Sequence, residues 1–399
     1  MRTLFGAPEK VEFCTKCNMS NQRPSSILEY HHDFPRTDAG YLNFNSEGVC
    51  DACVYCESKY TTIDWKAREE KLLKLLDKHR KSNGEYDCLV PGSGGKDSVY
   101  ASHILKYKYG MNPLTATWPP ILYTEYGYKN FLNWINIGGF DNVTLRPNGK
   151  VLRKLIKLSI QNLLHPFQTF ILGQKNFAVK VALKHKIPLI FYGENEAEHG
   201  NKIADNKSSL RDSSYHTYKN IKNIYLGGVK YDDLIKKYKV SKKKLDYFLP
   251  ASHSEFEKNN VEVHYLGYYL KWTPQETFYY SVENCGFRPR PFRTAGTYSK
   301  YNSIDDKIDD LHYYTTFIKF GIGRATYDVS QEIRNDHLSI EEGKKLIKKY
   351  DGEFPEVYIK DICEYLKMSK YSLIKHFDKF RSPHIWKKIK NRCYLRHTC

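Results

Sequence analysis

The sequence predicts an α/β fold: a parallel-sheet domain that follows a cysteine-rich N-terminal module and precedes a helical C-terminal region. From Tyr86 to about Asp205, short apolar runs alternate with helical patterns, as a parallel sheet requires. A glycine-rich turn at residues 93–98 separates the first apolar run from a helical pattern. Two Cys-x-x-Cys pairs lie in the first 60 residues, before this alternation begins.

The elements follow one another in a regular order. Residues 1–60 are loop-like, and leucines spaced along residues 64–80 predict an amphipathic helix that Asn83-Gly84 ends. The predicted strands cover residues 86–91, 114–118, 142–145 and 187–192. Residues 206–260 are polar and partly helical, residues 261–336 are aromatic-rich, and residues 337–399 read as a small all-helical tail.

The length and composition of the chain limit the classes of protein to which it can belong. The chain has 399 residues, 41% of them hydrophobic, which predicts a folded protein of two or three domains. The N-terminus lacks a signal-peptide core and no apolar run reaches membrane-spanning length, so we expect a soluble, cytoplasmic protein. The net charge of +18 has two interpretations: general lysine bias, or a positive surface for anionic substrates or RNA.

The glycine-rich turn carries the chemistry. It reads Ser93-Gly94-Gly95-Lys96-Asp97-Ser98, between a strand and a helix, where phosphate oxygens can meet a helix N-terminus. The glycines allow close backbone approach, the serines donate hydroxyls, Lys96 adds charge and Asp97 can help hold Mg²⁺. The Walker pattern is absent. The turn resembles the PP-loop of ATP pyrophosphatases, which cut ATP between its α and β phosphates; the alternative is a Ser/Gly surface turn.

The N-terminal cysteines predict a metal site. Cys14, Cys17, Cys50 and Cys53 form two Cys-x-x-Cys knuckles that can together complete a tetrahedral structural Zn²⁺ site. Four thiolates complete a tetrahedral site, so His31 and His32 are not needed as ligands. Cys56 either replaces one of the four cysteine ligands or is buried in the core. A catalytic redox pair and unligated core cysteines are the alternatives.

These features predict six regions. They are a cysteine-rich zinc module (1–60), a linker helix (61–85), a PP-loop ATP-binding domain (86–205), a helical insertion or lid (206–260), a return to the core with the substrate region (261–336) and a helical C-terminal module (337–399).

Sequence blocks along nearly the whole chain resemble the N-acetyl sugar amidotransferases. The blocks are residues 14–20, 23–24, 48–53, 63–69, 117–120, 165–168, 173–176, 191–195, 319–326, 332–334, 351–355 and 380–386. The version containing Trp118 is most similar to the branch associated with flagellin and pseudaminic acid.

The resemblance implies that the protein converts an N-acetyl group of a bacterial surface sugar to an acetamidino group, using ATP and ammonia. The implied substrates are sugars of the pseudaminic or legionaminic acid type or diacetamido uronic acids, as in flagellin glycosylation or lipopolysaccharide O-antigen biosynthesis. The ammonia would come from a separate glutaminase that is paired with a cyclase-like subunit. The chain has no glutaminase signature of its own: residue 2 is Arg2, and no G-x-C-x-G elbow occurs.

Further residues are candidates for the site. Glu194 and Asn195 end a predicted strand, where they can touch magnesium or substrate or simply cap the strand. Gln174 and Lys175 can contact nucleotide or substrate, or start a helix. Trp118 can lie near the adenine or in the core. Arg324 and Arg334 can bind a sugar carboxylate or phosphate, or form structural salt bridges.

Two other functions remain open. PP-loop enzymes that modify tRNA also adenylate a carbonyl, although thiolation usually needs cysteines beyond a zinc set, and we expect no nucleic-acid partner. The other alternative is a non-catalytic interaction protein, because residues 359–377 faintly resemble a helix-turn-helix.

Overall fold

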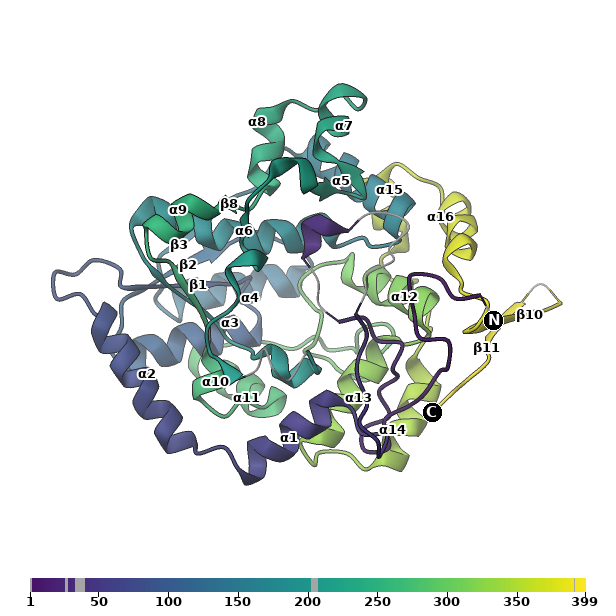
Figure 1. The fold of residues 1–399 in the computed structure, drawn as a ribbon, viewed down its shortest axis with the longest axis horizontal. Coiled ribbons are helices and arrows are strands. Elements are labelled where there is room, and N and C mark those ends of the chain that lie inside the picture. Colours follow the sequence, from purple (N-terminus) through teal and green to yellow (C-terminus); the bar gives the residue numbers. More distant parts are fainter. Residues whose placement is uncertain (1, 26–27, 33–39, 202–206, 391) are drawn as a thin grey trace.

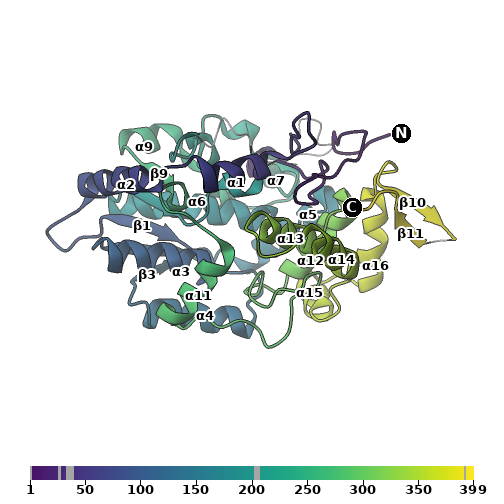
Figure 2. The ribbon, with the colours of Figure 1, turned by 90° about the horizontal axis from the view of Figure 1, so that it is seen from below.

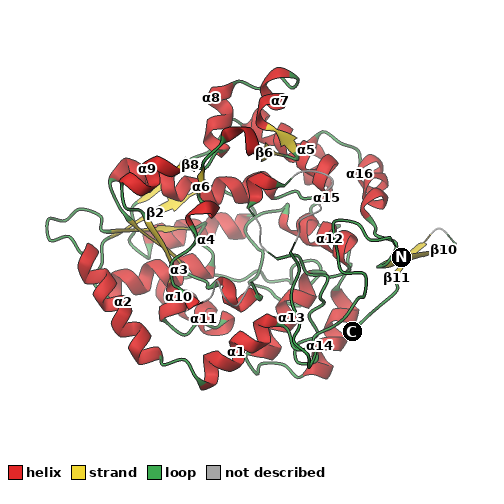
Figure 3. Ribbon diagram, in the orientation of Figure 1, coloured by secondary structure: helices red, strands yellow, loops and turns green. Residues whose placement is uncertain are grey.

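The structure, a computed structural model, is built on a five-stranded sheet in which every neighbouring pair of strands is parallel. It describes residues 2–25, 28–32, 40–201, 207–390 and 392–399. The strands are β1 (Cys88–Pro91), β2 (Pro113–Thr117), β3 (Asn142–Thr144), β4 (Leu189–Tyr192) and β9 (Glu262–Tyr265) (Figure 3). The mixed α/β class with a parallel sheet is therefore confirmed.

Helices cover both faces of the sheet, because successive side chains of a strand point to opposite sides. Leu89 packs in a core with α5 (Gly149–Leu163) and α6 (Gln168–His185). Its neighbours Cys88 and Val90 pack on the other face with α2 (Trp65–His79), α3 (Lys96–His103) and α10 (Leu266–Tyr269). Figure 2 shows α2, α3 and α6 around strand β1. Both faces are thus buried, as a parallel sheet requires.

The strand order places a switch point at the centre of the sheet. The order is β3-β2-β1-β4-β9, so the chain runs outward from β1 through β2 to β3 and then continues on the other side of β1. Loops that leave the carboxyl ends of β1 and β4 diverge there, which leaves a crevice where such sheets bind ligands. The loop after β1 is residues 92–95, and the loop after β4 begins at Gly193.

The predicted strands and the helix of residues 64–80 are found within a few residues of their predicted bounds, alongside elements that were not predicted. The remaining helices and strands are α1 (Asp51–Thr61), α4 (Glu125–Asn136), β5 (Thr217–Tyr218), β6 (Tyr225–Leu226), β7 (Val229–Lys230), α7 (Tyr231–Lys236), α8 (Lys242–Leu245), β8 (Ala251–Ser252), α9 (His253–Lys258), α11 (Pro274–Cys285), α12 (Asp309–Phe320), α13 (Arg324–Arg334), α14 (Ile340–Tyr350), α15 (Ile359–Leu366), α16 (Lys370–Phe377), β10 (Trp386–Ile389) and β11 (Arg392–Leu395). The sequence analysis did not predict α1, β9 or the hairpin β10–β11, so the tail is helical but not all-helical.

The N-terminal module packs against the C-terminal helices, although the two are far apart in sequence (Figure 1). The Ser330 hydroxyl donates to the carbonyl oxygen of Cys17 at 2.8 Å, and the backbone N–H of Leu4 donates to the Ser382 hydroxyl at 3.0 Å. Apolar side chains of the module share a core with α13. The module and the C-terminal region therefore form one packed unit.

The insertion packs on α5 and α6. Asn162 on α5 donates to the carbonyl oxygen of Gly227, and Asn176 on α6 donates to that of Phe248, both at 2.8 Å. Leu226, Leu234 and other apolar residues of the insertion join the core beneath. In the described part of the chain, no helix has both the length and the apolar character needed to cross a bilayer.

A buried ion pair joins the N-terminal module to the sheet. Lys59 Nζ on α1 lies 2.9 Å from the Glu198 carboxylate, and these side chains are 0% and 1% exposed. The same ammonium donates to Asn335 Oδ1 at 3.0 Å, after α13. The Lys59 ammonium therefore joins three segments that are distant in sequence: α1, the segment after β4 and the end of α13.

We expect Lys59→Met to lower the free energy of unfolding by about 3–5 kcal/mol, because it leaves the Glu198 charge buried and unpaired. Urea denaturation measures this change. The exposed pair Lys16–Glu57 provides a matched control, since Lys16→Met should cost less than about 1 kcal/mol. Equal costs for the two variants would contradict a structural role of the buried pair.

Candidate functional site

The turn after β1 has the backbone geometry of a phosphate-binding loop. Gly94 has φ +84°, and a Cβ on it would lie 2.6 Å from the Cα of Phe131, so only glycine fits. Gly95 precedes the first residue of α3, Lys96. The free N–H groups of this helix start and its dipole favour an anion beside the loop.

Lys96 and Asp97 form a contact pair at the start of α3. Lys96 Nζ donates to both Asp97 carboxylate oxygens, at 2.9 and 2.8 Å, and Trp272 Nε1 donates to Oδ1 at 3.1 Å. Burial raises the pKa of Asp97, Lys96 lowers it, and Glu194 raises it further. A phosphate or a cation at this point would compete directly with the pair.

Glu194, at the end of β4, lies beside them. A Cβ on the preceding Gly193 would lie 2.6 Å from the Asp97 carbonyl oxygen, so the two strand-end loops touch. The Glu194 carboxylate lies 3.1 Å from His199 Nε2. Burial acts to raise the pKa of Glu194, but His199 and Lys96 outweigh it and lower the pKa to about 2. Glu194 is therefore ionised at neutral pH.

These groups open into a cavity of about 440 Å³. Eight of the predicted site residues line it: Gly94, Gly95, Lys96, Asp97, Gln174, Glu194, Arg324 and Arg334. They come from the loops after β1 and β4, from the start of α3, from α6 and from α13. The volume and the convergent polar groups are typical of a small-molecule site.

Four other predicted residues lie outside this lining. Ser93 donates to Asp305 Oδ2 at 2.7 Å, and Ser98 donates to the Gly95 carbonyl oxygen at 3.0 Å, so both hydroxyls hold the loop itself. Asn195 is buried and accepts from the Ala197 N–H at 3.2 Å, as the N-cap of a short 3-10 turn (Glu196–His199) that follows β4. Lys175 Nζ lies 5.4 Å from the centre of the Tyr215 ring.

Trp118 lies in the core, one of the two places that the sequence left open, and is not among the residues that line the cavity. Its side chain is 2% exposed and meets Phe248 edge to face at 5.5 Å. A Cβ on Gly173 would lie 2.0 Å from the indole ring, so the glycine makes room for it. The reason is packing, because the strand end turns the indole towards α6.

Arg324 and Arg334 line the cavity but have partners within the protein. Arg324 pairs with Asp328 at 3.0 Å and also donates to the Tyr313 hydroxyl. Arg334 donates to the Glu198 carbonyl oxygen at 2.9 Å and contacts Cys17 Sγ at 3.7 Å. Within the described chain, the Nε atoms of both arginines are buried without a hydrogen-bond partner. Their binding of a sugar carboxylate or phosphate stays a prediction.

The sequence analysis missed several lining residues. Arg23 comes from the cysteine-rich module and Asn130 from α4, while Asp305 precedes α12 and Asp309 is its first residue. Burial, with the neighbouring Asp305, raises the pKa of Asp309 well above its usual value. The acidic run 305–310 was a visible signal, but an acidic run is more often a solvated surface.

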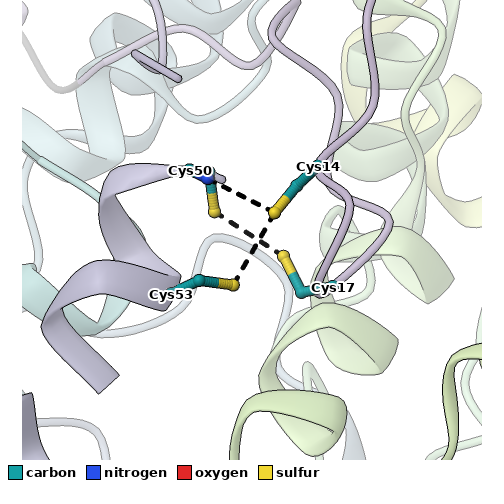
Figure 4. A group of neighbouring side chains, drawn as sticks. All are labelled: Cys14, Cys17, Cys50 and Cys53. Atoms are coloured by element: carbon teal, nitrogen blue, oxygen red, sulfur yellow. Dashed lines mark hydrogen bonds between the residues drawn. The ribbon is translucent and has the colours of Figure 1, made fainter. Parts of the chain in front are cut away.

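The four predicted cysteine ligands converge (Figure 4). Their Sγ atoms lie within 4.8 Å of one another, with 3.7 Å between Cys14 and Cys53 and 3.6 Å between Cys17 and Cys50. Zn–S bonds of about 2.3 Å in a tetrahedron imply edges of about 3.8 Å, so the donor set fits such an ion. Cys56 lies outside this group and donates to the Arg334 carbonyl oxygen.

Fold and site together define a class: a parallel-sheet α/β protein with a PP-loop at the switch point and a buried four-cysteine centre beside it. Residues 295–397 match the family model described as "LPS biosynthesis protein WbpG-like, C-terminal domain". This segment of the chain is therefore similar to the C-terminal domain of the WbpG-like lipopolysaccharide biosynthesis proteins. The last four blocks of the amidotransferase resemblance lie inside this range, and the match confirms the family resemblance.

Other similarities are partial. An uncharacterized protein of Methanocaldococcus jannaschii is 34% identical over 77 residues, which are 18% of this chain and 26% of that protein. The chain thus spans about a quarter of the curated relative's length. An NH₃-dependent NAD synthetase from Campylobacter jejuni matches 49% of this chain and 92% of its own, with 15% identity and a TM-score of 0.28. The U34-tRNA thiolase NcsA from Methanococcus maripaludis matches 85% and 86%, with 13% identity and a TM-score of 0.29.

We expect the four-cysteine group to bind a metal ion. Protein loaded with Co²⁺ should show intense thiolate-to-metal charge-transfer absorption, which Cys17→Ser should weaken strongly because one ligand is lost. Cys363→Ser is the control, since this half-buried cysteine lies outside the group. A spectrum that does not change in Cys17→Ser would contradict the site.

We expect Trp118→Ala to lower the free energy of unfolding by about 3–5 kcal/mol, because it leaves a large cavity in the core. The KM for ATP of the folded fraction should not change. Thermal unfolding and ATP titration at a temperature well below the midpoint measure the two effects. If Trp118→Ala had normal stability and a raised KM for ATP, the result would instead indicate that Trp118 contacts the nucleotide.

Proposed function

We propose that this protein is an ATP-dependent amidotransferase that converts an N-acetyl group of a bacterial surface sugar to an acetamidino group. One observation carries the proposal. The PP-loop and Glu194 form one wall of the cavity, and residues 301–334, within the range matched to the WbpG-like domain, supply much of the other. A nucleotide-type loop and a domain of lipopolysaccharide biosynthesis thus share one cavity.

The proposed reaction solves a leaving-group problem. An amide carbonyl is a poor electrophile and cannot lose oxide, so its oxygen first attacks the α-phosphorus of ATP and displaces pyrophosphate. The product is an imidoyl-adenylate. Ammonia then attacks the imidoyl carbon, AMP leaves, and the nitrogen loses a proton to give the amidine. The protein must stabilise pyrophosphate and hold the reactants in line.

The chain's own residues suit these tasks. The N-terminus of α3 and Lys96 would bind the phosphates of ATP and the departing pyrophosphate. Asp97 and the ionised Glu194 would hold Mg²⁺, which neutralises phosphate charge when bound. Gln174 would contact the nucleotide or the sugar. The structural Zn²⁺ would fix the module that contributes Arg23 to the cavity wall.

The nitrogen source and the sugar belong to the same proposal. A separate glutaminase with a cyclase-like partner would supply ammonia, and the sugar would be of the pseudaminic, legionaminic or diacetamido uronic acid type. A cytoplasmic location suits a reaction that consumes ATP.

Modification of tRNA is the second candidate, supported by the net charge of +18. Sulfur transfer lacks a nucleophile here: no cysteine is among the described residues that line the cavity, and Cys88 and Cys285 are 0% and 1% exposed. Attachment of an amine to a tRNA base needs no thiol. The assay described next distinguishes this reaction from the reaction on a sugar.

The test incubates the purified protein with ATP, Mg²⁺, an ammonium salt and a panel of diacetamido sugars. We expect AMP and pyrophosphate together with one sugar whose mass corresponds to replacement of O by NH. Nucleotide analysis and mass spectrometry measure both products. AMP formation that depends on tRNA and on none of the sugars would overturn the proposal.

We expect Lys96→Ala to lower kcat about 10²–10³-fold, since it removes a charge that stabilises the departing pyrophosphate. Lys184→Ala, on the exposed end of α6, is the matched control and should leave the rate of AMP release unchanged. Equal rates in the two variants would show that the PP-loop lysine takes no part in the reaction.

A further inference from the structure

A second group of metal-ligating side chains lies apart from the four cysteines. Glu29 belongs to a short 3-10 turn, η1 (Glu29–His31), His32 follows it, and His165 lies in the turn between α5 and α6. One ligand atom from each lies within 4.8 Å of the others. None of the three was among the predicted ligands.

The distances within this group suit a shared cation better than direct hydrogen bonds. Glu29 Oε2 lies 3.5 Å from His165 Nε2 and 3.7 Å from His32 Nδ1. Both separations are at or beyond the limit of a hydrogen bond. Two ligands bound at about 2.1 Å to one tetrahedral ion are about 3.4 Å apart.

Burial makes the group costly without an occupant. The three side chains are between 10% and 12% exposed. Glu29 Oε2 itself is buried and has no hydrogen-bond partner in the described chain. A buried carboxylate oxygen without a hydrogen-bond donor depends on nearby positive charge, from imidazolium groups or from a bound cation, to offset its lost hydration.

We propose that Glu29, His32 and His165 bind a divalent transition-metal ion, Zn²⁺ above all, in a second metal site. Two imidazole nitrogens and one carboxylate oxygen are a common ligand set for this class of ion. Magnesium and calcium are disfavoured, because they prefer oxygen ligands.

Surrounding contacts hold two of the ligands in place. Gln168 Nε2 donates to the Glu29 carbonyl oxygen at 2.7 Å, and the Tyr30 hydroxyl donates to the carbonyl oxygens of Ser214 and Thr217, both at 2.8 Å. His312 stacks on His165 with ring centres 5.2 Å apart. Such outer contacts orient metal ligands and are typical of built sites.

The site borders the candidate active site. His312 lines a second cavity of about 270 Å³, which shares Gln174, Asp305 and Asp309 with the first. A metal ion here would fasten the N-terminal segment that carries Glu29 and His32 to the α5–α6 turn. It would thereby fix one side of this second cavity.

The competing interpretation is a network of ion pairs. Burial acts to raise the pKa of Glu29, but His32, His165 and the nearby Lys175 lower it below its usual range. Protonated histidines would satisfy the carboxylate without metal. The two interpretations differ in metal content, which can be measured directly.

The experiment uses the full chain, saturated with Zn²⁺ and desalted, and counts all bound metals by mass spectrometry. We expect Glu29→Gln and His165→Gln each to hold about one equivalent less than the unmodified protein, because each loses one of three ligands. His185→Gln, exposed at the end of α6, should keep the full count. Circular dichroism verifies that each variant is folded.

A second readout uses Co²⁺. The protein should show visible d–d bands from a nitrogen and oxygen site that both variants lose, while the thiolate charge-transfer absorption stays. Equal metal counts and spectra in Glu29→Gln, His165→Gln and the unmodified protein would overturn the second site. The result is independent of the amidotransferase proposal, since it requires no turnover.

Discussion

The cavity depends on one buried ion pair, between Lys59 and Glu198. Lys59 belongs to the cysteine-rich module, Glu198 follows β4, and Asn335, which accepts from the same ammonium, follows α13. A pair without water is stabilising only when its geometry is nearly complete, so it fixes the three segments in one arrangement. These same three segments contribute part of the wall of the candidate site, through Arg23, Glu194 and Arg324.

The four-cysteine centre is therefore part of the site's framework and not a remote appendage. Arg334 contacts Cys17 Sγ with one guanidinium nitrogen and the Glu198 carbonyl oxygen with another. A metal bound by four thiolates carries net negative charge, which strengthens its attraction for this arginine. Metal binding would thus act on the cavity through Arg334, while Met19 and Arg23 extend the module into the wall.

The parts of the site that local sequence determines could be predicted. The glycine-rich turn and Glu194 follow buried strands, and the carboxyl ends of parallel strands meet at one edge. The cysteine spacing was equally informative, because each Cys-x-x-Cys turn can present both of its sulfur atoms to one metal ion. The sequence left Trp118 open between the nucleotide and the core, because only the packing around Gly173 decides which way a strand-end indole turns.

The missed residues share a different cause. Arg23 and Asp305 reach the cavity through tertiary packing between segments that lie far from the PP-loop in sequence, and no local pattern marks them. Glu29 and His165 are 136 positions apart (165 − 29), so their proximity was equally invisible. The short η1 and α1 in the module were missed because tertiary contacts and not periodicity stabilise them.

Charge pairing within the cavity bears on how an acidic sugar would bind. Lys96 is paired with Asp97, Arg324 with Asp328, and Arg334 is anchored on the cysteine centre. Arg23 also lines the cavity; no carboxylate of the described chain pairs with it, and its guanidinium carbon lies 5.4 Å from the centre of the Tyr327 ring. An anion that approaches Arg23 displaces no internal carboxylate, so its desolvation is compensated at lower cost. We therefore add Arg23, from the cysteine-rich module, to Arg324 and Arg334 as a candidate for binding a substrate carboxylate; the roles of all three stay predictions.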